Sequence, residues 1–481
     1  METSIRRVMV KFPADVDALG HAELVKLARD LWAVVQAQQA ELEEHRRAAK
    51  RQAAPFSKGK KDGKKKRPGR KKGQGLFTSR QPPAPEEVTE HVEVPSPTTC
   101  PRCGAGTLVF DHFEDAYTVD LPDHPTPEVT HFRSAVSHCG SCGKLDIRGS
   151  HPKLAPDQRG ATACRVGPKA FAAAHVIHYG LGVPVRKTPA ILAELTGVVI
   201  TQSAITQHAL RQAERPALCA EYQRLRDAIR QAPIAQTDDT GYRVNGDAAQ
   251  LMAFATPDTP QASGITVYQI RRQHRNEEVR EIIPSDFQGV MVTDRGRAYD
   301  AKELDEVKQQ KCIFHVGRSI AEALETKTGV ARNFGVRLID LLDQALQHWH
   351  RWHRGTRRGW HVKAARIADA ITVHLRQRKL KDDDNRRLLS ELGYHNDRGN
   401  LTRFLQDPNI PPTNNLSERE LRLPIQARKV SHCSKNDRGA RAAESHASVI
   451  RTEQRKHPPS LVAAVLPFLC APLSRAPPPP S

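Results

Sequence analysis

The run IAQTDDTGYRV, Ile234–Val244, opens the part of the sequence that decides the fold. The runs QLMAFA, Gln250–Ala255, and GITVYQI, Gly264–Ile270, follow it, and GVMVT, Gly289–Thr293, comes after a helical stretch at Asn276–Ile283. Each of the four runs is short, apolar or alternating, and bounded by turn residues, which is typical of a β-strand. The region therefore predicts three strands, a helix and a fourth strand.

The next two elements complete an order of strands and helices. We expect a helix near Tyr299–Val307 and a fifth strand at Lys311–His315. Three strands, a helix, a strand, a helix and a strand is the order of the ribonuclease H-like fold, an α/β layer with a mixed sheet. A multidomain α/β protein with a ribonuclease H-like core is therefore expected.

Two acids fall on neighbouring strands of that fold. Asp238 lies within the first strand, and Asp294 lies at the end of the fourth. Like charges that converge at one sheet edge repel unless cations bridge them, and Mg²⁺ takes oxygen ligands while keeping positions open for a phosphate. Taken alone, an acid at a strand end is more often a turn cap.

A third acid is supplied by Glu418, in the block PPTNNLSERELR, Pro411–Arg422. The prolines end a loop, and an asparagine then starts a helix. This placement aims Glu418 at the sheet edge, with Arg419 and Arg422 nearby for a DNA backbone. Without the other two acids, Glu418 would be a solvated first-turn carboxylate favoured by the helix dipole. With them, a site for two metal ions about 3.5–4 Å apart is predicted, suited to in-line displacement at a phosphate.

A long stretch at about residues 317–409 separates the strands from Glu418 and predicts a helical insertion. Its basic aromatic cluster at residues 348–354 could stack on DNA bases. However, Trp349 and Trp352 fall on the apolar stripe of the predicted helix, so core packing is the favoured interpretation.

The charge of the chain points to a polyanionic partner. It has 74 Lys and Arg against 54 Asp and Glu, a formal net charge of +20. Each phosphate neutralised by a cation releases counterions, so nucleic acid is the first choice of partner and an anionic membrane surface the second. No apolar run approaches the roughly 20 residues that span a bilayer, and the N-terminus lacks the pattern of a secretory signal. We expect the protein to stay inside the cell.

The composition divides the chain into six segments. They are an N-terminal helix (1–52), a basic linker or arm (53–88), a cysteine module (89–152), a helical segment (153–230), the α/β domain with its insertion (231–456) and a C-terminal tail (457–481). The N-terminal helix fits either a short coiled coil or a simple surface helix. The second segment is either a solvated linker or an arm that follows phosphates, and both can hold together. Its candidate DNA-binding residues are Lys64, Lys65, Lys66, Arg67, Arg70, Lys71 and Lys72.

Two Cys-x-x-Cys pairs, Cys100 with Cys103 and Cys139 with Cys142, indicate a structural zinc site. Two such knuckles form a tetrahedral four-thiolate site, and a glycine after the second cysteine lets the backbone amides face the sulfurs. Four thiolates leave no open position, so this Zn²⁺ would not be catalytic. The alternative is a pair of surface turns without a metal.

The helical segment contains a pattern that resembles a helix-turn-helix, Thr188–Gly197 followed by Thr201–Glu214. In such a motif the second helix enters the major groove, where Gln207 and Arg211 would face the DNA. An ordinary helical hairpin fits the pattern equally well.

Four blocks resemble the insertion-sequence-66 family of bacterial transposases: QTDDTGYRVNG, VMVTDRGRAYD, CIFHV and PTNNLSERELR. The resemblance implies that Asp238, Asp294 and Glu418 are the family's catalytic acids, with Mg²⁺ or Mn²⁺ as cofactor. It also implies that Cys312 and His315 match the family's Cys-x-x-His signature, which we expect to pack or position the active site. The sequence departs from the family at Asp239, where glutamate is more usual, and in the Arg-Gly-Arg that follows Asp294.

The resemblance also implies a function for the chain. The expected function is that of a DDE-type transposase, an enzyme that binds the ends of its element, cuts them and transfers them into target DNA. The expected partners are double-stranded DNA, further copies of the chain on that DNA and accessory proteins of the element, in the cytoplasm of a bacterium and associated with the nucleoid. The alternatives are a catalytically silent DNA-binding regulator and a nuclease of the same fold without strand transfer.

Overall fold

This computed structural model describes most of the chain from Val166 onward and parts of what precedes it. The described residues are 20–33, 35–36, 82–95, 97, 101–102, 111–113, 115–118, 122, 125–131, 133, 135–144, 147–148, 166–325, 327–376, 379–431 and 433–470. The chain divides into two units, residues 1–119 and 120–481. The seven basic residues of the predicted arm lie outside the described residues, as do Cys100 and Cys103.

In the first unit, residues 21–33 and 35–36 are helical, which confirms part of the predicted N-terminal helix. Leu24, Leu31 and Val35 are exposed on it. The coiled coil therefore stays a prediction, since only a partner helix would cover these side chains. A short 3₁₀ turn, η1 (Pro85–Glu87), follows in the described part of this unit.

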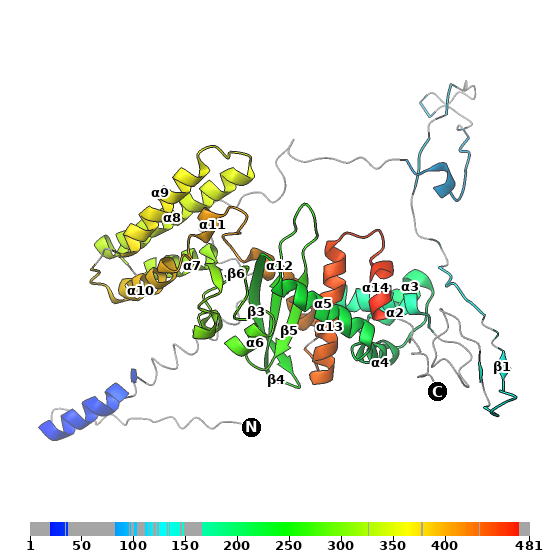
Figure 1. Cartoon of the computed structure of the whole chain (residues 1–481), viewed down its shortest axis with the longest axis horizontal. Helices are drawn as coiled ribbons and strands as arrows, with labels where there is room; N and C mark the ends of the chain where they lie inside the picture. Colours follow the sequence, from blue (N-terminus) through cyan, green and yellow to red (C-terminus); the bar gives the residue numbers. More distant parts are fainter. Residues whose placement is uncertain are drawn as a thin grey trace. The chain divides into compact units, whose positions relative to one another are not determined.

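The second unit is built on a five-stranded mixed sheet. Its strand order is β5-β4-β3-β6-β7, with β3 antiparallel to β4 and parallel to β6 (Figure 1). The first predicted strand is confirmed with its bounds, and the next three predicted strands are confirmed to within a few residues. The strands are β3 (Ile234–Val244), β4 (Asp247–Ala255), β5 (Thr266–Arg271), β6 (Val290–Thr293) and β7 (Lys308–Lys311). This architecture is compatible with the expected ribonuclease H-like core.

The β3–β4 hairpin is closed by Asn245 and Gly246, both in the left-handed region with φ 57° and 82°. Two such residues in succession are what a tight two-residue hairpin turn requires, because its twist then matches that of the strands. The turn fixes the register across the hairpin, in which Asp238 pairs with Ala253.

Two predictions in this region are wrong. The segment Tyr299–Val307 contains only the 3₁₀ turns η3 (Arg297–Tyr299) and η4 (Lys302–Leu304) in place of an α-helix. Tyr299 and Leu304 are both buried, and a five-residue spacing would place them about 140° apart on an α-helix. One helix could not bury both against the same face of the sheet.

The predicted strand Lys311–His315 is also displaced. β7 ends at Lys311, and the helix α7 (Ile313–Leu324) begins directly after Cys312. α7 buries Ile313, Val316 and Ile320, the three-and-four spacing of a helical face, which prevails over the strand-like composition of CIFHV. Cys312 and His315 therefore lie at the start of a helix.

Helices cover the sheet on both faces. One apolar cluster joins Met252, Phe254 and Met291 to the helices around them, and a second joins Leu251 and Tyr268 to the helix that carries Glu418. The helices before the sheet are α2 (Pro168–His175), the π-helical η2 (Val176–Gly180), α3 (Thr188–Thr196), α4 (Gln202–Gln212) and α5 (Pro216–Arg230), and α6 (Asn276–Arg280) lies between β5 and β6. Those after the insertion are α12 (Asn415–Ser431), α13 (Asp437–Arg455) and α14 (Leu461–Leu469).

α13 covers the outer edge of β5. The backbone N–H groups of Thr266, Tyr268 and Ile270 donate to side chains of α13, namely Thr452 Oγ1, Ser448 Oγ and Glu444 Oε1. These bonds satisfy donors that an open edge strand would leave unpaired. α14 packs beside α13 and α5 and buries Val465 and Leu469, so part of the segment assigned to a tail belongs to the core.

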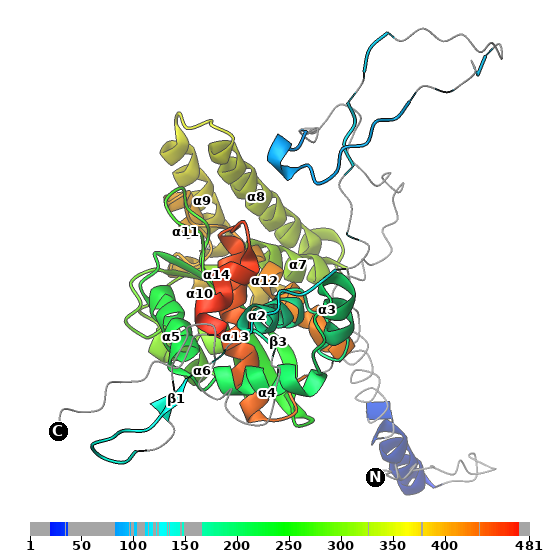
Figure 2. The same cartoon turned by 90° about the vertical axis from the view of Figure 1, so that its right-hand side faces the viewer.

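The predicted helical insertion is confirmed. After α7 it comprises α8 (Gly329–His353), α9 (Trp360–Arg376), α10 (Asp383–Asp397) and α11 (Arg403–Gln406). α8 and α9 lie side by side in Figures 1 and 2 and pack against each other. Trp349 and Trp352 pack against the insertion's apolar core, as expected, and Trp349 Nε1 donates to Pro408 O. No helix within the described residues is long and apolar enough to cross a membrane.

Candidate active site

Asp238 and Asp294 come from adjacent parallel strands in matching positions. β3 pairs with β6 in a constant register, Ile234 with Val290 through Gln236 with Val292. Carried two residues further, that register sets Asp238 across from Asp294. Both acids therefore leave the sheet at the same end, as the sequence predicts.

Asp238 is surrounded by other negative charges at this end of the sheet. Burial raises the pKa of Asp238 well above its ordinary value, and the negative charges of Asp294, Asp239 and Glu418 raise it further. The three predicted acids are thus close enough for their charges to interact, although they come from β3, from the end of β6 and from α12. A cation at this position would relieve the repulsion.

The start of α12 is attached to β3, and this attachment positions Glu418. Gln236 Oε1 accepts from Leu416 N at 3.1 Å, so a side chain from the sheet satisfies an N–H in the first turn of the helix. Asn414, fully buried, donates from Nδ2 to Thr237 O at 3.4 Å. Glu418 follows in the first turn with its side chain 35% exposed, which leaves it open to a substrate.

Cys312 and His315 lie beside Glu418. One ligand atom from each of the three residues lies within 4.8 Å of the others, and His315 Nε2 is 3.7 Å from Glu418 Oε1. Burial raises the pKa of the Cys312 thiol above its ordinary value. The geometry fits the expected positioning of Glu418 by this pair.

Gly296 leaves room for the Asp294 carboxylate. Its N–H donates to Asp294 Oδ1 at 2.8 Å. A Cβ atom added at Gly296 would lie 3.0 Å from that same oxygen and 3.3 Å from the Tyr299 ring. The middle residue of the Arg-Gly-Arg departure therefore has a packing reason to be glycine.

A second carboxylate on β3, Asp239, points to the opposite face from Asp238 and pairs with His274. The Nδ1–Oδ1 distance is 3.2 Å. Burial lowers the pKa of His274, but the hydrogen bond to Asp239 and the charges of Asp239 and Asp294 outweigh it, so that the pKa lies above its ordinary value. Sequence reasoning missed His274, because it stands alone in a polar loop without a motif.

Behind Asp294 lies a buried lysine that the sequence analysis did not identify as a site residue. Lys311 Nζ is 2.7 Å from Asp300 Oδ1 and donates to Thr293 Oγ1 at 3.3 Å. Burial lowers the pKa of Lys311, while Asp300 and then Asp294 favour its charged form. His395 of α10 lies 3.8 Å from Asp300, and burial together with the charge of Lys311 lowers its pKa to about 4. The insertion is thereby tied to the back of the site.

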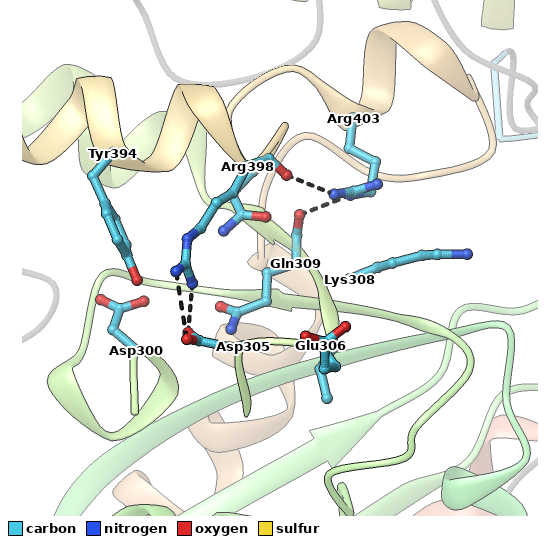
Figure 3. A pocket seen from close by; sticks show the side chains of 10 residues that line it. Asp300, Asp305, Glu306, Lys308, Gln309, Tyr394, Arg398 and Arg403 are labelled. Atoms are coloured by element: carbon cyan, nitrogen blue, oxygen red, sulfur yellow. Dashed lines mark hydrogen bonds and ion pairs between the residues drawn. The ribbon is translucent and has the colours of Figure 1, made fainter. Parts of the chain in front are cut away.

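Next to this cluster, a small polar cavity of about 90 Å³ lies between α10, η4 and β7 (Figure 3). Arg398 pairs with Asp305 there, and Arg403 donates to Gln309 O and to Arg398 O at 3.0 Å each. A volume of this size admits only a few water molecules. The side chains that line the cavity bond to one another and to the backbone, and these bonds connect the insertion to the sheet.

The predicted DNA-binding residues within the described chain are exposed. Arg419 and Arg422 lie on α12 next to Glu418, and Gln207 and Arg211 lie on α4. α3 ends at Gly197 with φ 68°, and Thr201 Oγ1 accepts from Ala204 N at the start of α4. The two predicted helices and their turn are present, while their role as a DNA reader stays a prediction.

One cysteine pair lies within the described residues, directly after the short strand β1 (Val136–Ser137), which pairs with β2 (Ile147–Arg148). Cys139 N donates to Lys144 O, Gly143 N donates to Cys139 O, and Gly143 has φ 70°. Hydrogen bonds from the backbone of Cys142 and Ser141 lower the pKa of the Cys139 thiol. This is the amide-to-sulfur geometry expected of a knuckle, and the four-thiolate site stays a prediction.

Comparison with known proteins identifies a family for this chain. No curated protein matches the chain. A protein family matches residues 163–442, which is more than half of the chain and includes all three acids, the insertion and the α3–α4 pair. The chain belongs to the transposase IS66 family.

Proposed function

We propose that this protein is a DDE-type transposase that cuts DNA at the ends of its element and joins those ends to target DNA. The observation that carries the proposal is that Asp238 and Asp294 leave the sheet at the same end, where the charges of Asp294 and Glu418 raise the pKa of Asp238. Membership of the family supplies the class of reaction. Three acids from separate elements rarely converge without a shared ligand, because each adds repulsion to the others.

The donor set fits a hard divalent cation. Asp238, Asp294 and Glu418 would hold Mg²⁺ or Mn²⁺ through carboxylate oxygens, the ligands that these ions prefer. Such ions, when bound, supply charge stabilisation for the attacking and leaving oxygens of a phosphodiester. Gly296 keeps the Asp294 carboxylate oriented, and His315 holds Glu418 from the other side.

The surrounding cations fit a nucleic-acid substrate. Arg419 and Arg422 are exposed beside Glu418, where a guanidinium can contact a phosphate in a bidentate manner. Gln207 and Arg211 on α4 would contact the DNA ends, and the basic arm would add contacts that do not depend on sequence. The partners proposed are double-stranded DNA, other copies of the chain and accessory proteins of the element.

A structural Zn²⁺ at the cysteine module is part of the proposal. Its support is the backbone geometry around Cys139 and Cys142. Metal analysis of the purified protein should give one zinc per chain, and Cys142→Ser should lose it while Cys219→Ser, which changes an exposed cysteine elsewhere, should keep it.

Cleavage of labelled DNA that carries the element's own ends tests the function. With Mg²⁺ or Mn²⁺, the protein should expose a 3′-hydroxyl and then join it to target DNA. Asp294→Asn should abolish both steps, while Asp286→Asn, which removes an exposed acid outside the site, should not. Tight binding without cutting, even with the accessory proteins present, would instead make the protein a regulator, and cutting without joining would make it a nuclease.

A further inference from the structure

A wide cleft lies at the far end of the β3–β4 hairpin, away from the three acids. Its volume is about 920 Å³, and it is lined by the hairpin on one side and by the end of α12 with the loop after it on the other. Three of its lining residues are cations: Arg243, Arg428 and Lys435. We propose that this cleft binds the phosphodiester backbone of the DNA strand that leads into the active site, a proposal that rests on the proposed function.

The cleft lies further along β3 and α12 from the active site. Side chains on the Asp238 face of β3 meet successive positions along α12 and the loop after it. Asp238 interacts with Glu418, Thr240 Oγ1 accepts from Arg428 Nη1 at 3.4 Å, and the Tyr242 hydroxyl bonds to Ser434 Oγ at 3.0 Å. α12 and β3 therefore run side by side from the acids to the cleft.

The wall of the cleft is held in place. The loop after α12 joins the hairpin through a bridge between Val244 and Ser434 and through a bond from Asn245 N to Ser434 O at 3.0 Å. Two strand-like backbone contacts in succession fix the loop without help from a ligand. A rigid wall positions its cations before DNA arrives, which reduces the ordering cost of binding.

Within the described part of the chain, no acid forms a salt bridge with Arg243, Arg428 or Lys435. Arg243 donates to the backbone oxygen of Gly246 and Arg428 to the hydroxyl of Thr240, both neutral acceptors. The acids Asp247 and Asp437, which lie near the hairpin and the loop in sequence, both pair with Arg272. The cations of the cleft thus keep their charge for a polyanion.

The length of β3 sets where the contact falls along the DNA. Four residues separate Asp238 from Tyr242, a span of about 13 Å at roughly 3.3 Å per residue. Phosphates of one DNA strand follow one another at about 3.4 Å along the duplex axis. The cleft should therefore contact the strand about 13 Å, a few nucleotides, from the bond that is cut.

The test measures DNA binding without cleavage. Fluorescence anisotropy of the full-length protein is recorded in EDTA, with a labelled duplex and a labelled single strand of arbitrary sequence, across a range of salt concentrations. The double variant Arg428→Gln/Lys435→Gln should bind both more weakly, with the slope of log K against log salt reduced by about two, one for each lost phosphate contact. The matched control Lys302→Gln removes an exposed cation outside the cleft and should leave the slope unchanged.

A second double variant, Arg428→Lys/Lys435→Arg, keeps both charges and should bind both probes with the slope of the unmodified protein. The Arg428→Gln/Lys435→Gln variant, if it folds and binds both probes with an unchanged slope, would overturn the proposal, and so would a slope that falls equally in the charge-preserving variant. Neither result depends on cleavage, so a failure here is separate from a failure of the transposase proposal.

Discussion

Asp238 is a carboxylate that the folded protein holds among other negative charges. Its raised pKa means that the protonated group favours the fold at pH values below its ordinary pKa of 3.8. That contribution is lost as the pH rises through the raised value. At neutral pH, the protein without metal therefore carries a repulsion that a cation removes.

Replacing this carboxylate should stabilise the protein without metal and abolish its response to magnesium. In EDTA at neutral pH, Asp238→Asn should raise the melting temperature by roughly 2–4 °C, which corresponds to about 1 kcal/mol in a domain of 150–250 residues. Mg²⁺ should raise the melting temperature of the unmodified protein and of Asp286→Asn, because it binds the folded state, but not that of Asp238→Asn. A destabilised Asp238→Asn in EDTA would show that the site is not repulsive.

Lys311 is buried behind the same site and should matter for stability. Lys311→Met keeps most of the unbranched chain but leaves Asp300 without its partner, so we expect a loss of about 1–3 kcal/mol in the free energy of unfolding. Urea denaturation measures this loss. Lys308→Met on the same strand is the control, since Lys308 is exposed. Equal stability of the two variants would contradict the role of the Lys311–Asp300 pair.

The attachment of α12 to β3 is an interaction between two elements, and Gln236 makes it. Gln236→Met preserves the volume but removes the acceptor for Leu416 N, at a cost of about 0.5–1.5 kcal/mol. Because Glu418 then loses part of its positioning, DNA cleavage should fall by more than this modest loss of stability explains. Gln269→Met on β5, which changes another buried glutamine, is the matched control. Equal cleavage rates in the two variants would show that Gln236 does not position the site.

The elements show how far the sequence could predict the fold. The alternating run around Asp238 and the apolar run before Asp294 predict two strands. The pattern is visible in the sequence because one or both faces of each strand are buried. β7 has the sequence KQQK, which carries no strand pattern, since its buried polar side chains bond to partners that only the tertiary structure supplies. The local composition predicted a strand at His315. The helical spacing of the apolar residues around it predicts the helix that is present there.

The candidate site could be predicted only in part, for the same reason. Asp238, Asp294 and Glu418 stand in distinctive blocks of sequence, so the pattern identified them. His274 and His395 lie in stretches without a motif, and they meet Asp239 and Asp300, respectively, only through the path of the chain in space. Contacts of this kind have no local signature.

At the scale of the whole molecule, α14 contributes to the core from beyond the region that the family match covers. Ending the chain at residue 459 would remove Val465 and Leu469, each fully buried. At about 1.5–3 kcal/mol for each side chain, the loss should be about 3–6 kcal/mol. A chain ending at residue 470 keeps the helix and should melt like the full-length protein, and equal melting of the two shortened chains would exclude a structural role for α14.

Both outer edges of the sheet are already occupied. α13 side chains bond to β5, and on the opposite edge Lys311 N donates to Asn400 O while Gln309 O accepts from Arg403. Among the described residues, these contacts leave neither outer edge of the five-stranded sheet open for a strand from a second chain. Any contact between copies of this unit would therefore fall on its helices and loops rather than on an edge of this sheet.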